Sequence, residues 1–147
     1  MPKSLVYSLL IGMSLLVGAC SGRRPETLGV TDGKFAPCPD SPNCVSSQSD
    51  DPDHVIEPLR YEGTPQAARE QLLSVIRKMK RVNIIIEQEH YLRVEYTSAV
   101  FRFVDDVEFF FDPSKKLIHV RSASRIGYSD LGVNRQRVEQ IRTAFAE

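Results

Sequence analysis

Two segments in the second half of the chain carry most of the side chains that could do chemistry. Residues 102–108 contain Arg102, Asp105, Asp106 and Glu108. The second segment combines guanidinium, hydroxyl and carboxylate groups: Arg121, Ser122, Ser124, Arg125, Tyr128 and Asp130. Arginines beside hydroxyl groups suit the binding of a carboxylate or a phosphate, because the planar guanidinium donates paired hydrogen bonds to such oxygens. The two segments therefore predict a surface that recognises an anionic group.

The spacing of the charged residues predicts ion pairs between two neighbouring strands. Polarity alternates along both segments, and in the longer run 100–111 the odd positions Phe101, Phe103, Phe109 and Phe111 fall on one face. If that face packs on the core, Glu108 lies near Arg121 on the opposite face, and Asp106 lies between Arg121 and Arg125. A ladder of salt bridges on a solvated sheet face also explains this pattern, so that interpretation stays open.

Alternation places Asp105, Ser122 and Ser124 on the core face. A carboxylate there must be paired or hydrogen-bonded. The serines, or an arginine of the last helix such as Arg135, could serve as partners, and a β-bulge could instead return Asp105 to solvent. Either arrangement predicts a polar pocket where residues 127–134 meet the sheet. The residues expected at its rim are Tyr128, Asp130, Asn134 and Arg135.

Catalysis has weaker support. Asp105 and Asp106 are adjacent, so on a regular strand they point to opposite faces and cannot act as a paired acid and base. A hydrolase-like site that uses either aspartate with Tyr128 is the alternative hypothesis. Ser46 and Ser47 follow a cysteine loop and are interpreted as cap or turn residues. Metal-ligand spacing is absent from the three histidines, so neither a metal nor a cofactor is expected: His54, His90 and His119.

Apolar periodicity predicts the elements that position these residues. A helix begins at Thr64, which can cap it, and Pro65 suits the first helical position. A last helix starts near Asn134, with Val133 and Val138 as a hydrophobic staple. Strands are expected at residues 82–87, 91–97, 100–111 and 117–126. This order predicts an α+β fold: an antiparallel sheet of about four strands in meander order, two helices packed on one face, and the other face polar and partly wet.

The start of the chain is typical of an exported lipoprotein. Lys3 precedes an apolar run at residues 5–17, and the small residues Gly18 and Ala19 precede Cys20. The run is shorter than the roughly 20 residues that span a bilayer. The cysteine after small residues resembles a bacterial lipobox, which implies cleavage before Cys20, lipidation of its thiol and anchoring to a membrane. An ordinary cleaved signal peptide is the simpler alternative.

The remaining cysteines predict a disulfide in an oxidising compartment. Lipidation of Cys20 leaves Cys38 and Cys44, which are expected to pair. The predicted organisation is a signal peptide at residues 1–19, a flexible tether at 20–33, and one α+β domain at 34–147 that opens with an irregular disulfide-containing segment.

The charge balance limits the classes of partner that are expected, and the residue after Cys20 bears on the expected location. The chain has 19 basic and 19 acidic side chains, and this balance argues against nucleic acid. The expected location is the bacterial cell envelope, facing the periplasm. Ser21 after the lipidated cysteine favours the outer over the inner membrane. The expected partners are the membrane, through the anchor, and an anionic ligand or an envelope protein.

The chemically interesting segments also carry a family resemblance. Residues 38–48 (CPDSPNCVSSQ), 102–109 (RFVDDVEF) and 121–137 (RSASRIGYSDLGVNRQR) resemble the domain-of-unknown-function family numbered 1499. The resemblance covers roughly residues 35–142. That family occurs in bacteria and photosynthetic eukaryotes, often behind a lipoprotein or membrane segment, and has no established activity. The resemblance implies a shared fold and a shared functional surface at the motif positions, without naming a reaction.

The sequence therefore favours a non-catalytic binding or interaction module at the membrane surface. Arg102, Arg121, Arg125 and Arg135 are expected to contact the anionic group, and Asp105 and Asp106 to orient them. An envelope hydrolase and a purely structural envelope protein are the two alternatives.

Overall fold

The computed structural model describes residues 22–147. The predictions of a signal peptide at residues 1–19 and of lipidation at Cys20 concern residues outside this range. Within the described range, no helix is both long and apolar enough to cross a membrane.

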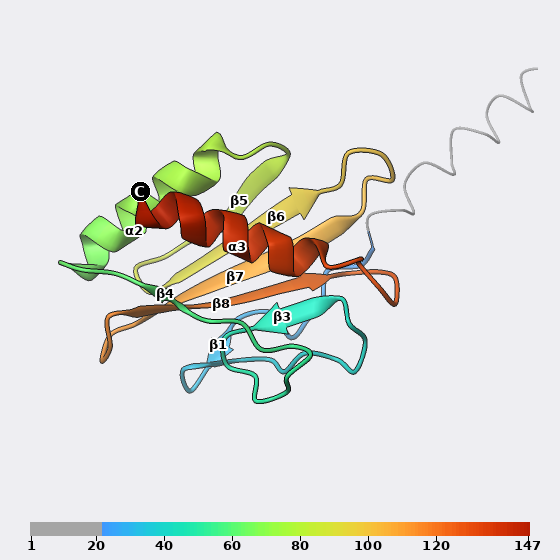
Figure 1. Cartoon of the computed structure of the whole chain (residues 1–147), viewed down its shortest axis with the longest axis horizontal. Coiled ribbons are helices and arrows are strands. Elements are labelled where there is room, and N and C mark those ends of the chain that lie inside the picture. The colour runs from blue at the N-terminus through green and yellow to red at the C-terminus, as the bar shows by residue number, and fades with distance from the viewer. Residues whose placement is uncertain (1–21) are drawn as a thin grey trace, which may run out of the picture.

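An antiparallel sheet with two helices on one face forms the described domain (Figure 1). Four strands make the predicted meander: β5 (Val82–Glu87), β6 (Tyr91–Thr97), β7 (Val104–Asp112) and β8 (Leu117–Ser124). Two short strands, β3 (Cys44–Ser46) and β4 (Leu59–Arg60), pair with the outer edge of β8. The main sheet of residues 22–147 thus has six strands, where the sequence predicted about four. Segments of two or three residues are too short to show alternation.

The first described helix, α2 (Pro65–Lys78), begins as predicted. The Thr64 hydroxyl accepts a hydrogen bond from the backbone N–H of Ala67 at 3.2 Å, and Pro65 takes the first turn. Its apolar stripe includes Leu72 and Ile76, both buried against the sheet.

The last helix, α3 (Val133–Ala146), begins one residue earlier than predicted. Gly132, in the left-handed conformation with φ of 80°, precedes it without a side-chain cap. The expected staple around an Asn134 cap is wrong, because Val133 is exposed. Asn134 instead lies inside the helix and is fully buried. This phase of the helix decides which later side chains face the sheet.

The core lies between the helices and one face of the meander. Val107, Phe109 and Phe111 of β7 point into it, as alternation predicted. The strand starts at Val104 rather than at residue 100. Arg102 has a φ of 58°, and this left-handed backbone interrupts extended structure before β7. Phe101, expected in the core, is consequently 68% exposed.

The opposite side of the sheet, here called the polar face, is covered by the start of the described chain. A two-stranded hairpin of β1 (Val30–Thr31) and β2 (Lys34–Phe35) lies on this side (Figure 1). Residues 22–33, predicted as a tether, make direct contacts with the sheet through Arg24 and Gly29. The expectation of a partly wet face is wrong for its centre, because Asp106 and Glu108 are 1% and 0% exposed.

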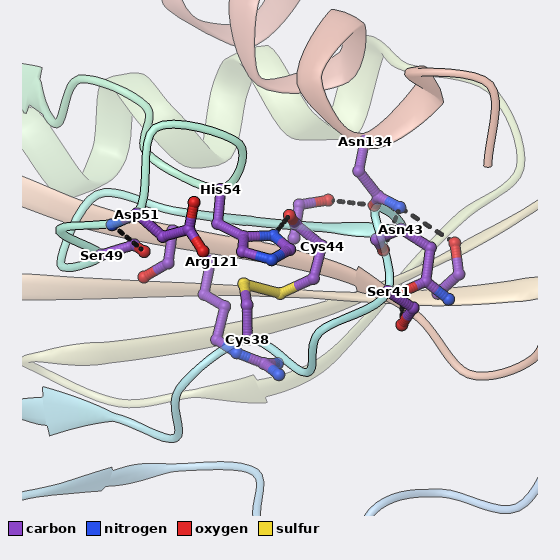
Figure 2. The surroundings of a disulfide bond; sticks show 12 residues. Cys38, Ser41, Asn43, Cys44, Ser49, Asp51, His54, Arg121 and Asn134 are labelled. Carbon is purple, nitrogen blue, oxygen red and sulfur yellow. Dashed lines mark hydrogen bonds between the residues drawn. A yellow bond between two sulfur atoms is a disulfide. The ribbon is translucent and has the colours of Figure 1, made fainter. Parts of the chain in front are cut away.

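The predicted disulfide is present and joins this covering segment to the sheet edge. Cys38 and Cys44 are bonded with their Cα atoms 5.7 Å apart. Cys44 belongs to β3 and pairs with Ala123 of β8. His54 Nδ1 lies 2.9 Å from the Cys44 carbonyl oxygen, and its ring is drawn above the bridge in Figure 2.

Candidate functional site

Cross-strand pairing builds a row of charges on the polar face. Arg93 of β6 lies opposite Glu108 of β7, which lies opposite Arg121 of β8. Arg121 Nη1 is 3.3 Å from Glu108 Oε2, so the predicted proximity of these two residues is confirmed. In the next row, Glu95 lies opposite Asp106. The predicted ladder of salt bridges is therefore present, but its side chains are largely buried rather than exposed to solvent.

Arg125 joins the second row through two carboxylates. Its Nε and Nη2 donate to Asp106 Oδ2 and Oδ1 at 2.7 and 2.8 Å. It also bonds Glu95, which accepts a further bond from Arg24 at 3.0 Å. The hydrogen bonds to Asp106 raise the pKa of the Arg125 guanidinium. Burial opposes ionisation of Glu95, but bonds from the two arginines outweigh it and lower the pKa of that carboxyl.

Glu108 connects the sheet to the segment above it. Its Oε1 accepts the backbone N–H of Gly29 at 2.7 Å and the Tyr91 hydroxyl at 2.7 Å. Burial, together with the neighbouring Glu108 charge, raises the pKa of Tyr91, which therefore remains a donor. One carboxylate thus ties β6, β8 and the covering segment together.

Two buried guanidinium nitrogens on this face have no hydrogen-bond partner among the described residues, Arg93 Nε and Arg121 Nε. Arg121 also lines a pocket of about 350 Å³ between the covering segment and the sheet. The pocket wall includes Asp106, Arg125 and the disulfide residue Cys38. Figure 2 shows the Arg121 side chain beside the disulfide. We call this space the Arg121 pocket.

A second polar cluster lies on the core face beneath α3. Asp105 Oδ2 accepts a hydrogen bond from Arg137 Nη2 at 2.6 Å. The sequence predicted an arginine of the last helix for this role and named Arg135, which is wrong. Arg135 instead donates to the carbonyl oxygens of Val55 and Asp53 on the outer side of the helix.

Asn134 organises the rest of that cluster. Its Oδ1 accepts from Arg137 Nη1 at 2.6 Å and from the Ser122 hydroxyl at 2.5 Å. Its Nδ2 donates to Ser124 Oγ and to Asp130 Oδ2 at 2.9 and 2.8 Å. The cluster is closed on itself, which indicates a structural role in holding α3 against β8.

The predicted binding residues therefore do not converge on one place. Asp105 and Asp106 point to opposite faces, and each is paired with a different arginine. Arg102 is exposed in the loop before β7. Tyr128 is 75% exposed, and within the described residues no hydrogen bond joins it to either aspartate. Of the four predicted arginines, Arg121 and Arg125 share a site.

Sequence reasoning missed four residues that the structure makes prominent: Arg93, Arg137, Ser47 and His119. Arg93 alternates onto the polar face of β6, so its position was available from the strand pattern. Arg137 is three residues after Asn134 and thus shares its helix face. Ser47 and His119 are brought together by the pairing of β3 with β8, which no local signal reveals.

The fold and the buried ionic network define a small α+β domain whose two sheet faces each enclose a separate polar cluster. A family model described as "Protein of unknown function (DUF1499)" matches residues 34–145, and the chain belongs to this family. The resemblance found in the three motifs is thereby confirmed. No curated protein matches the chain.

Proposed function

We propose that the Arg121 pocket makes this protein a binding module, a non-catalytic site that recognises an anionic group, a carboxylate or a phosphate. One observation carries the proposal: the Arg121 Nε is buried without a partner while its side chain lines an open pocket. Buried donors are almost always satisfied in folded proteins. A guanidinium with unused donors beside a pocket is therefore suited to a ligand that accepts hydrogen bonds.

The charges around the pocket favour an anion. Around this pocket, four arginines meet three carboxylates: Arg93, Arg121, Arg125 and the more exposed Arg24 against Glu95, Asp106 and Glu108. The excess is positive, and it lies under a covering segment that reduces screening by solvent.

The arginines of this pocket differ in how many of their N–H donors are already used within the protein. Arg125 uses its guanidinium on Asp106 and Glu95, so it contributes charge to the wall of the pocket. Arg121 makes one contact, with Glu108, and a guanidinium carries five N–H donors. We therefore assign direct recognition to Arg121. The disulfide at Cys38 holds the facing wall in place.

The test is thermal unfolding of the full chain, purified in detergent, with sodium phosphate or sodium succinate at constant ionic strength. These anions are expected to raise the melting temperature of the unmodified protein relative to chloride. Arg121→Lys keeps the charge opposite Glu108 but loses the planar fork, so the shift should disappear. Arg77→Lys, on the exposed surface of α2, is the matched control and should keep the shift.

A melting temperature that no phosphate or carboxylate raises would remove the support for anion binding. An equal shift in Arg121→Lys and in the unmodified protein would place the anion elsewhere.

The proposal includes anchoring to a membrane through lipid on Cys20, with the domain in the bacterial envelope. It rests on the lipobox-like start of the sequence, since Cys20 lies outside the described residues. Mass spectrometry of the N-terminal peptide after expression in a Gram-negative host tests it. The expected first residue is an acylated Cys20, whereas an uncleaved, unacylated terminus would contradict the anchor.

A further inference from the structure

A second pocket on the polar side, of about 650 Å³, contains groups that the anion-binding proposal does not use. It lies between the β1–β2 hairpin, the residues after β3 and the turn that joins β7 to β8. Ser47, Asp112 and His119 are in its wall, together with Lys34 and Lys115. The volume is in the range of small-molecule sites.

Three of these side chains form a connected series. Ser47 Oγ is 3.2 Å from His119 Nδ1, and His119 Nε2 is 3.8 Å from Asp112 Oδ2. Asp112 is held by Ser114, whose backbone N–H and hydroxyl both donate to Asp112 Oδ1 at 2.8 and 2.6 Å. Phe110 stacks on the imidazole with ring centroids 6.3 Å apart. The three groups come from positions 47, 112 and 119, so the fold creates the series.

The hydrogen bonds fix the direction of the serine proton. The backbone N–H of Val120 donates to Ser47 Oγ at 2.9 Å, which occupies one acceptor position of the hydroxyl. The hydroxyl hydrogen can then point to His119 Nδ1, with the single N–H of the neutral imidazole on Nε2, on the side of Asp112. Burial of His119 lowers its pKa below the usual value of 6.5, so the imidazole is a neutral acceptor at pH 7.

We propose that Ser47, His119 and Asp112 form a hydrolytic site for small carboxylic esters, with Ser47 as nucleophile, His119 as general base and Asp112 as the group that orients His119. A nucleophile within reach of a base that a third group holds is the arrangement that activates serine. The two lysines of the pocket wall are matched by two further aspartates, Asp32 and Asp50, so the charge of the wall does not select the charge of the substrate.

The reaction balances without any co-reactant except water. Ser47 Oγ forms a bond to the ester carbonyl carbon, and its proton moves to His119 Nδ1. The bond from that carbon to the alkoxy oxygen breaks, and the leaving alcohol takes the proton from His119. Water then gives a proton to His119 while its oxygen bonds the acyl carbon. The bond from that carbon to Ser47 Oγ breaks, Oγ takes the proton back from His119, and the acid is released.

A purely structural role also fits Ser47, because its hydroxyl oxygen accepts the Val120 N–H where β3 ends. The experiment therefore measures reactivity rather than stability. The full chain is incubated with a fluorophosphonate probe, and tryptic peptides are mapped by mass spectrometry. In labelling, the Ser47 Oγ–phosphorus bond forms, the phosphorus–fluorine bond breaks, fluoride leaves, and the proton passes through His119 to solvent.

We expect one adduct, on Ser47. His119→Asn keeps a polar side chain and should slow labelling by about 100-fold or more, the usual contribution of a general base. Ser49→Ala, which removes a hydroxyl from the same pocket, is the matched control and should label at the unmodified rate. Ser47→Ala should abolish both labelling and hydrolysis of p-nitrophenyl succinate.

The pH profile separates a base from a structural histidine. The charged groups that face His119 are Asp112, Lys115 and Lys34, and burial outweighs the attraction of Asp112. Labelling should rise with pH in a step centred below the usual histidine pKa of 6.5, and this step should be absent in His119→Asn. An absence of Ser47 adduct, or an adduct formed equally fast in His119→Asn, would overturn the site. Neither result bears on the separate proposal that Arg121 binds an anion.

Discussion

Arg137→Met is expected to lower the free energy of unfolding by about 3–5 kcal/mol, because it leaves the buried Asp105 carboxylate without its partner. Arg137 donates to Asp105 at 2.6 Å and to Asn134 and Ser122. Its guanidinium also stacks over the Tyr96 ring at 4.7 Å. Urea unfolding followed by circular dichroism measures the loss as a lower midpoint with an unchanged slope.

Two further variants assign the loss to the unpaired carboxylate. Asp105→Asn combined with Arg137→Met removes the stranded charge and should recover a large part of the stability. Arg77→Met breaks an exposed pair with Glu87 and should cost no more than about 1 kcal/mol. If Arg137→Met cost as little as Arg77→Met, the Asp105 carboxylate would have another source of compensation and the buried pair would be unimportant.

The arginine that pairs with Asp105 could be predicted only in part from the sequence. The requirement for an arginine near Asp105 followed from alternation and from the cost of burying a carboxylate. The choice between Arg135 and Arg137 depended on the rotation of α3, and treating Asn134 as the cap gave the wrong rotation. The left-handed Gly132 starts the helix at Val133, which turns positions 134, 137, 138 and 141 inward. Gly132 has no capping side chain, and the carboxylate that accepts the Asn134 N–H comes from Asp130, outside the usual capping position.

The long strands and helices were predictable because the apolar residues of each recur at the spacing of a strand or of a helix. Strands β5, β6 and β8 and helix α2 each repeat an apolar pattern over six or more residues. Register across β7 and β8 then followed from alternation, and Glu108 and Arg121 were placed correctly. Strand β3 has three residues, and its partner Ala123 is far away in the sequence. Only tertiary structure specifies such pairing, and the Ser47–His119 contact depends on it.

The covering of the polar face was not predictable for a different physical reason. Residues 22–33 bury few apolar side chains, so their composition is that of a tether. They attach through polar contacts instead, with the Gly29 N–H on Glu108 and Arg24 on Glu95. Hydrogen bonds from backbone N–H groups cannot be inferred from amino-acid composition. The sequence therefore predicted an exposed ladder of salt bridges, whereas the structure has a buried network with a pocket beside it.

Glu108→Ala is expected to cost about 3–5 kcal/mol, comparable to the loss in Arg137→Met, and also to loosen the covering segment. The fully buried carboxylate accepts bonds from Gly29, Tyr91 and Arg121, and its removal strands all three donors, one of them charged. Urea unfolding reports the stability. Limited trypsinolysis reports the segment, since the bond after Lys34 in β2 should be cleaved faster in the variant than in the unmodified chain.

Two milder variants separate charge from hydrogen bonding. Glu108→Gln keeps an acceptor for the Gly29 N–H but removes the charge opposite Arg121, so it should lose stability while cleavage after Lys34 stays slow. Tyr91→Phe removes one donor and should cost about 1 kcal/mol. Fast cleavage after Lys34 in the unmodified chain would contradict this account, because it would show that Glu108 does not hold the covering segment on the sheet. The Arg121 pocket, which that segment forms with β8, would then lack one wall.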